Sequence, residues 1–153
     1  MDINAKQFTS DIVANAAGCL EGTLRQWRNR YGLLGQTITG TKETKYYSAL
    51  DVCVVRAVAL LARYMTASYA IWFVEGRVRN QMKALLEGKT KTPSSIGFYL
   101  PESGADPVFS SDPGDTAEEL LADTEGVIVL VDLNTAVIDR VFKVLKLGSP
   151  KRG

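Results

Sequence analysis

Gly18 separates two short runs of apolar residues that recur at helical spacing. This break, which we call the glycine corner, constrains the fold more than any other feature of the sequence. The apolar residues of the two runs are Ile12, Val13, Ala16, Leu20, Leu24 and Trp27. Glycine accepts the positive φ angle that a tight corner between two helices requires. The sequence therefore predicts two helices that pack against each other through these residues, the second covering about residues 21–30.

The second predicted helix leaves a polar and strongly basic set of side chains on its other faces. These side chains are Thr23, Arg25, Gln26, Arg28, Asn29 and Arg30. Arginine can bond guanine edges or phosphates, and Asn and Gln can pair with adenine. A solvated basic helix in an ordinary domain would have the same charges, but the glycine corner and the apolar register together favour a helix-turn-helix that binds DNA.

Residues 35–46 form a short polar segment rich in Gly and Thr, and its alternation around Gly40 predicts a hairpin. Lys42 and Lys45 would lie near its tip or on its return strand, where they can follow a phosphate backbone. A loop with two solvated lysines is the alternative. Ser48 then begins a long apolar helix, in which Asp51 is placed to complete a capping box.

Two motifs in this region, TLRQWRNRYGLL and TKETKYYSALDV, resemble the mercury-resistance-regulator (MerR) family of winged-helix transcription factors. The matching residues are Thr23, Leu24, Arg25, Trp27, Arg30, Tyr31, Gly32, Leu33, Tyr47, Ser48, Asp51 and Val52. Lys45 stands where the family usually has Arg, and the proline that usually follows Gly-Leu-Leu is missing. Because Lys lacks the guanidinium fork, we expect a weaker or less directional wing contact. The resemblance covers residues 8–65.

We expect the helix at residues 21–30 to enter the major groove, with Arg25 and Arg28 at base edges or flanking phosphates. The side chains expected to hold the DNA backbone and set the register are Thr23, Arg30, Tyr31, Lys42 and Lys45. Trp27 and Tyr47 are expected to pack rather than to contact DNA.

The formal net charge of the chain is only +1, which is not typical of a nucleic-acid-binding protein, but the charges are unevenly distributed. Residues 1–65 contain eight Lys and Arg against five Asp and Glu, and residues 66–153 contain ten against twelve. A basic front half (+3) and an acidic rear half (−2) are consistent with a DNA-binding module joined to a part with another role.

An apolar seam with alternating three- and four-residue steps follows the basic half. Its residues are Ile71, Val74, Val78, Met82 and Leu85. The MerR-like family typically dimerises through a helix after the DNA-binding domain, so the seam is the expected self-association surface. An ordinary helix that packs against its own chain has the same pattern, since the seam is shorter than three heptads.

The rear of the chain reads as a small α/β unit. The expected elements are strands at 96–100 and 127–131, and helices at 117–123 and 136–147 capped by Thr116 and by Asn134 or Thr135. The apolar, β-branched run at 127–131 is typical of a strand buried on both faces. The order strand, helix, strand, helix suggests parallel pairing, in a sheet completed by more strands from the loop or by a second subunit. This unit is expected to pair subunits or to respond to a small-molecule or protein effector.

The sequence offers little for catalysis or metal binding. It contains no His and no nucleophile elbow, and two isolated Cys do not make a zinc site. Asp132, after the second predicted strand, is the best acidic candidate, but helix initiation explains it equally well. We therefore expect no enzyme activity, no metal and no cofactor. Without a signal segment or an apolar run long enough for a bilayer, a cytoplasmic protein with no membrane partner is expected.

The sequence thus predicts an α+β protein in three parts: a winged helix-turn-helix at 1–66, a connecting or dimerisation helix at 67–88, and a small α/β unit at 89–153. The predicted function is that of a sequence-specific, double-stranded-DNA-binding transcriptional regulator acting as a homodimer. Two alternatives stay open. One is an architectural DNA-binding protein of the excisionase or phage-packaging type. The other is a protein-interaction adaptor that does not touch DNA.

Overall fold

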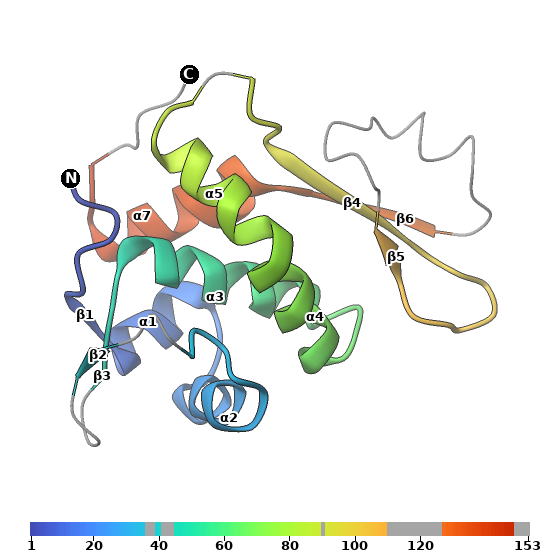
Figure 1. Ribbon diagram of the computed structural model, residues 1–153, viewed down its shortest axis with the longest axis horizontal. Helices are drawn as coiled ribbons and strands as arrows, with labels where there is room; N and C mark the ends of the chain where they lie inside the picture. The colour runs from blue at the N-terminus through green and yellow to red at the C-terminus, as the bar shows by residue number, and fades with distance from the viewer. Residues whose placement is uncertain (36–38, 41–44, 90, 110–126, 149–153) are drawn as a thin grey trace.

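The computed structural model describes residues 1–35, 39–40, 45–89, 91–109 and 127–148, and these form an α+β fold as the sequence predicts (Figure 1). The helices are α1 (Ser10–Ala17), α2 (Glu21–Tyr31), α3 (Ala49–Leu61), α4 (Ala67–Phe73), the π-helical η1 (Val74–Val78), α5 (Arg79–Leu86), the π-helical η2 (Leu133–Asp139) and α7 (Arg140–Leu145). The strands are β1 (Phe8–Thr9), β2 (Thr39–Gly40), β3 (Lys45–Tyr47), β4 (Ser95–Leu100), β5 (Val108–Phe109) and β6 (Val127–Asp132).

The expected glycine corner lies between α1 and α2. Gly18 ends α1 with a φ of 79°, in the left-handed region that favours glycine. Leu24 and Trp27 are buried as expected, but Ile12 and Leu20 are exposed, Leu20 by 77%. Leu20 has extended backbone as the N-cap of α2, so it lies outside the helical register that the apolar spacing assumed.

Replacing Gly18 with alanine is expected to lower the free energy of unfolding by roughly 1–2 kcal/mol, the cost of a left-handed conformation for an L-residue. A Cβ atom here would also lie 3.0 Å from Nη1 of Arg56 and 3.3 Å from Nη2 of Arg140. Urea denaturation measures the effect. Gly22→Ala is the matched control, since its Cβ would meet no atom within 4 Å in the described structure. Equal stability of the two variants would contradict this account of the corner.

Helix α3 is the centre of the fold, with the other helices arranged around it (Figure 1). Apart from Ala59 and Leu60, all its residues are buried. The predicted capping box is confirmed: the Asp51 backbone N–H donates to Ser48 Oγ at 3.0 Å, and the Ser48 N–H donates to Asp51 Oδ2 at 2.9 Å. This box fixes where the helix begins, directly after β3.

The apolar seam after α3 packs inside its own chain. Val74, Val78 and Met82 are fully buried, Ile71 is buried, and Leu85 is half-buried against the same core. Helices α5 and η1 rest on α3. The expectation that these five residues form a subunit interface is therefore wrong, and the alternative of an ordinary packed helix is right.

The rear strands pair differently from the prediction. Strand β6 is antiparallel to β4, with Ser95 opposite Asp132 and Leu100 opposite Val127, and β5 pairs with the other edge of β4. Strand β6 is exposed or half-buried along its length rather than buried on both faces. The sheet projects from the helical body (Figure 1), so its apolar residues pair across strands instead of filling a two-sided core. The helix predicted at 117–123, with its Thr116 cap, lies outside the described residues.

The last two helices, η2 and α7, belong to the central core. They pack against α1 and α3, and the apolar residues of both halves form one cluster. The described residues of the rear half therefore do not build a separate core. The cap of η2 is Asp132, whose Oδ1 accepts hydrogen bonds from the backbone N–H groups of Asn134 at 2.9 Å and Thr135 at 3.4 Å. Asp132 thus has a structural role, and neither Asn134 nor Thr135 is the cap.

Candidate nucleic-acid interface

Helix α2 has one continuous exposed face that is polar and basic. Its residues are Gly22, Arg25, Gln26, Asn29 and Arg30. Steps of three and four residues place them on one side of the helix. On the opposite side, Leu24 and Trp27 are buried and hold α2 against the core. Eleven residues at a rise of about 1.5 Å give a rod of roughly 16 Å, and a helix of about 10–12 Å diameter fits the width of a DNA major groove, about 12 Å.

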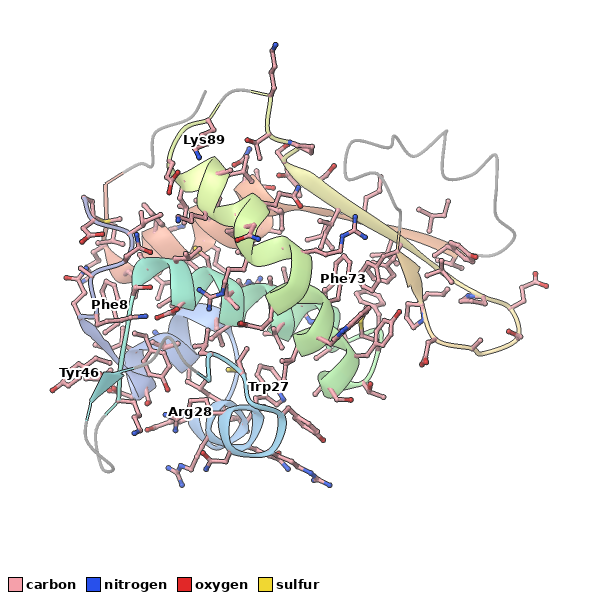
Figure 2. All side chains as sticks on the ribbon, in the orientation of Figure 1. Phe8, Trp27, Arg28, Tyr46, Phe73 and Lys89 are labelled. Carbon is pink, nitrogen blue, oxygen red and sulfur yellow. The ribbon has the colours of Figure 1, made fainter. Side chains whose placement is uncertain are left out.

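Arg28 does not lie on this exposed face, contrary to its expected place at base edges. It is half-buried, its guanidinium carbon lies 5.8 Å from the centroid of the Tyr47 ring, and its Nε atom is buried without a hydrogen-bond partner among the described residues. Figure 2 shows Arg28 on the flank of α2 toward the β1–β3 sheet, and Trp27 directed into the body. Arg28 therefore holds α2 against β3.

Tyr47 receives this contact from inside the core. Its side chain is fully buried, and the Ser10 hydroxyl donates to its oxygen at 3.3 Å. Burial raises the pKa of the Tyr47 hydroxyl, while the Ser10 hydrogen bond and the positive charge of Arg28 oppose that rise. The expectation that Tyr47 packs in the core is confirmed.

The ends of α2 differ in charge. Glu21 is exposed in the first turn, where a carboxylate stabilises the positive end of the helix dipole and can also accept a hydrogen bond from cytosine. Arg30 lies in the last turn, with its guanidinium carbon 5.6 Å from the centroid of the exposed Tyr31 ring. Thr23 is half-buried beside the exposed face. Four of the residues predicted to contact DNA thus lie on this face, with Tyr31 at its end and Thr23 at its edge. They are Arg25, Gln26, Asn29 and Arg30.

A small antiparallel sheet in the order β1–β3–β2 packs beside α1, and Arg28 of α2 lies over the Tyr47 ring of its central strand. The pairing of Gly40 with Lys45 agrees with the predicted hairpin. Lys45 is half-buried and Tyr46 is exposed. Tyr46 is not among the residues predicted to contact DNA, although strand alternation with the buried Tyr47 indicates that its side chain is exposed. Lys42 lies outside the described residues.

No protein-family model matches the chain, and no curated protein matches it. The assignment of function therefore depends on α2 and its surroundings.

Among the helices of the described residues, none is long and apolar enough to cross a membrane. Burial raises the pKa of the half-buried Cys19 thiol and, more strongly, that of the buried Cys53 thiol.

Proposed function

We propose that the protein is a sequence-specific, double-stranded-DNA-binding transcriptional regulator with a MerR-like winged helix-turn-helix. The observation that supports this most is the exposed face of α2, where Arg25 and Asn29 stand one turn apart on a helix anchored by Leu24 and Trp27. Arginine reads guanine bidentately and asparagine reads adenine in the same way. An anchored rod that presents both is suited to the major groove.

Arg28 has a positioning role in this proposal. Because its guanidinium lies over the Tyr47 ring, it fixes the angle between α2 and the β2–β3 hairpin, which we propose is the wing. Lys45 on β3 is then placed to contact a phosphate beside the groove that α2 enters. A phosphate contact adds affinity on any sequence, whereas Arg25 and Asn29 add specificity.

The proposal retains a homodimer and a cytoplasmic location. Two copies would read a palindrome with half-sites one helical turn apart, about 34 Å. Their contact must lie outside the seam from Ile71 to Leu85, whose side chains are buried or half-buried within one chain. We place any effector response in the rear half, whose helices share a core with α1.

Selection from a library of random DNA duplexes tests this function. We expect enrichment of one palindromic motif, bound at physiological salt at least about 1,000-fold more tightly than a scrambled duplex. Tandem sites with cooperative binding and strong bending would instead identify an architectural protein. A complete lack of salt-sensitive DNA retention would reject both and leave the protein-interaction adaptor.

A further inference from the structure

Two arginines from distant parts of the chain meet at the C-terminal end of α1. Arg56 of α3 donates from Nη1 to the carbonyl oxygen of Ala17 at 3.1 Å, and Arg140 of α7 donates from Nε to that of Ala16 at 3.4 Å. The last turn of α1 contains no basic residue of its own. The arginines therefore supply the positive charge that the negative end of a helix dipole favours. Arg56 is 8% exposed and also donates from Nε to the Ala136 carbonyl at 3.1 Å.

The same arginines line an open cavity of about 600 Å³ between α3, η2 and α7, which we call the α1-end pocket. Its lining residues are Arg56, Thr135, Ala136, Arg140, Lys143 and Val144. Three of these are cationic, and none of the described lining residues is acidic. A volume of this size is typical of pockets that hold small molecules.

Capping of α1 alone does not explain this arrangement. Two N–H groups suffice for the carbonyls of Ala16 and Ala17, yet each guanidinium has five, and Lys143 and Thr135 contact neither carbonyl in the described hydrogen bonds. The crowding is also unfavourable. Burial lowers the pKa of Arg56, and the positive charges of Arg140 and Arg63 lower it further. A bound anion would relieve this repulsion.

We propose that the α1-end pocket binds a small phosphate-bearing molecule. Two planar guanidinium groups and an ammonium match the several oxygens and double charge of a phosphate group, and the Thr135 hydroxyl adds a donor. Resting on the proposed function, the inference extends to regulation. A ligand competes for guanidinium groups that hold the carbonyls directly before the Gly18 corner, so its binding changes how α1 presents α2 to DNA.

Isothermal titration with pyrophosphate at constant ionic strength tests the pocket without DNA. We expect a dissociation constant below about 1 mM for the parent protein. Arg140→Gln with Lys143→Gln is expected to weaken binding at least about 10-fold, and Arg140→Lys, which keeps the charge but loses the fork, less. Lys146→Gln is the matched control, because Lys146 is exposed on the same segment but does not line the pocket. Thermal melts verify that each variant folds. Equal binding by all four proteins, or none by the parent, would overturn the proposal.

A second titration separates the pocket from the DNA site. Pyrophosphate is expected to change the affinity of the parent protein for its selected duplex at least about 5-fold, a typical allosteric coupling, and to leave the Arg140→Gln, Lys143→Gln variant unaffected. If Lys143→Gln alone, which leaves both capping arginines in place, binds DNA more weakly without pyrophosphate, the cavity belongs to the DNA footprint and the small-molecule assignment is wrong. Pyrophosphate binding without an effect on DNA would overturn the regulatory part alone. A parent protein that binds pyrophosphate but no duplex would reject the proposed function and leave the pocket standing.

Discussion

Replacing Arg25 and Asn29 together with alanine is expected to lower the affinity for the selected duplex at least about 100-fold, because each bidentate base contact contributes roughly 1–3 kcal/mol of discrimination. Both side chains are exposed and lie outside the buried core. The free energy of unfolding should therefore stay within about 0.5 kcal/mol of the parent value. Fluorescence anisotropy with a labelled duplex measures the affinity, and circular dichroism measures the stability.

Lys89→Ala is the charge control for this experiment. It removes a positive charge from the end of the molecule opposite α2 (Figure 2), so the affinity should be nearly unchanged. Arg28→Ala provides a further contrast. Since Arg28 packs over the Tyr47 ring, its loss should lower both stability and affinity. An Arg25, Asn29 variant that binds like the Lys89 variant would remove the exposed face of α2 from the interface.

The largest loss of stability is expected from Asp51→Ala, about 3–5 kcal/mol in the free energy of unfolding. Asp51 is only 1% exposed, and it closes the capping box of α3 with Ser48. It also pairs with Lys6 at 2.5 Å and with Arg79 at 3.3 Å. Alanine removes the Asp51 half of the capping box, so that the Ser48 backbone N–H loses its acceptor, and leaves two half-buried cations without this partner. The carboxylate thus joins the N-terminal segment, the central helix and α5 in one contact.

Urea denaturation of Asp51→Ala and Glu75→Ala separates this contact from an ordinary ion pair. Glu75 also pairs with Arg79, at 3.4 Å, but is more exposed, so its loss should cost less than about 1 kcal/mol. Asp51→Asn, which keeps a capping oxygen, should fall between the two. Similar losses from Asp51→Ala and Glu75→Ala would show that the buried carboxylate does not have this central role.

Local signals in the sequence were enough to predict the N-terminal elements. The positive φ angle at Gly18, the capping box of Ser48 and Asp51, and the pairing around Gly40 each depend on residues a few positions apart. Leu20 shows the limit of such reasoning, because the apolar spacing did not reveal that it precedes the helix.

Features that depend on distant residues could not be predicted. The periodicity at Val74, Val78 and Met82 is the same for a subunit interface and for a buried helix, and only the position of α3 decides between them. The direction of pairing between β4 and β6 is a tertiary property. The sequence predicts Arg28 as a DNA contact, because it does not show that Tyr47 of β3 lies against the guanidinium group. The α1-end pocket could not be predicted for the same reason, because its arginines are far apart in sequence.

Nuclear magnetic resonance with ¹⁵N-labelled protein and the selected duplex tests most directly whether α2 binds DNA. We expect the largest amide shift changes in Glu21–Tyr31 and smaller ones in Lys45–Tyr47, with little change in the sheet of β4, β5 and β6. The size of these changes should fall as salt increases, because the duplex releases counterions on binding. Amides of α2 that stay unchanged at saturating duplex, while another surface responds, would contradict the account.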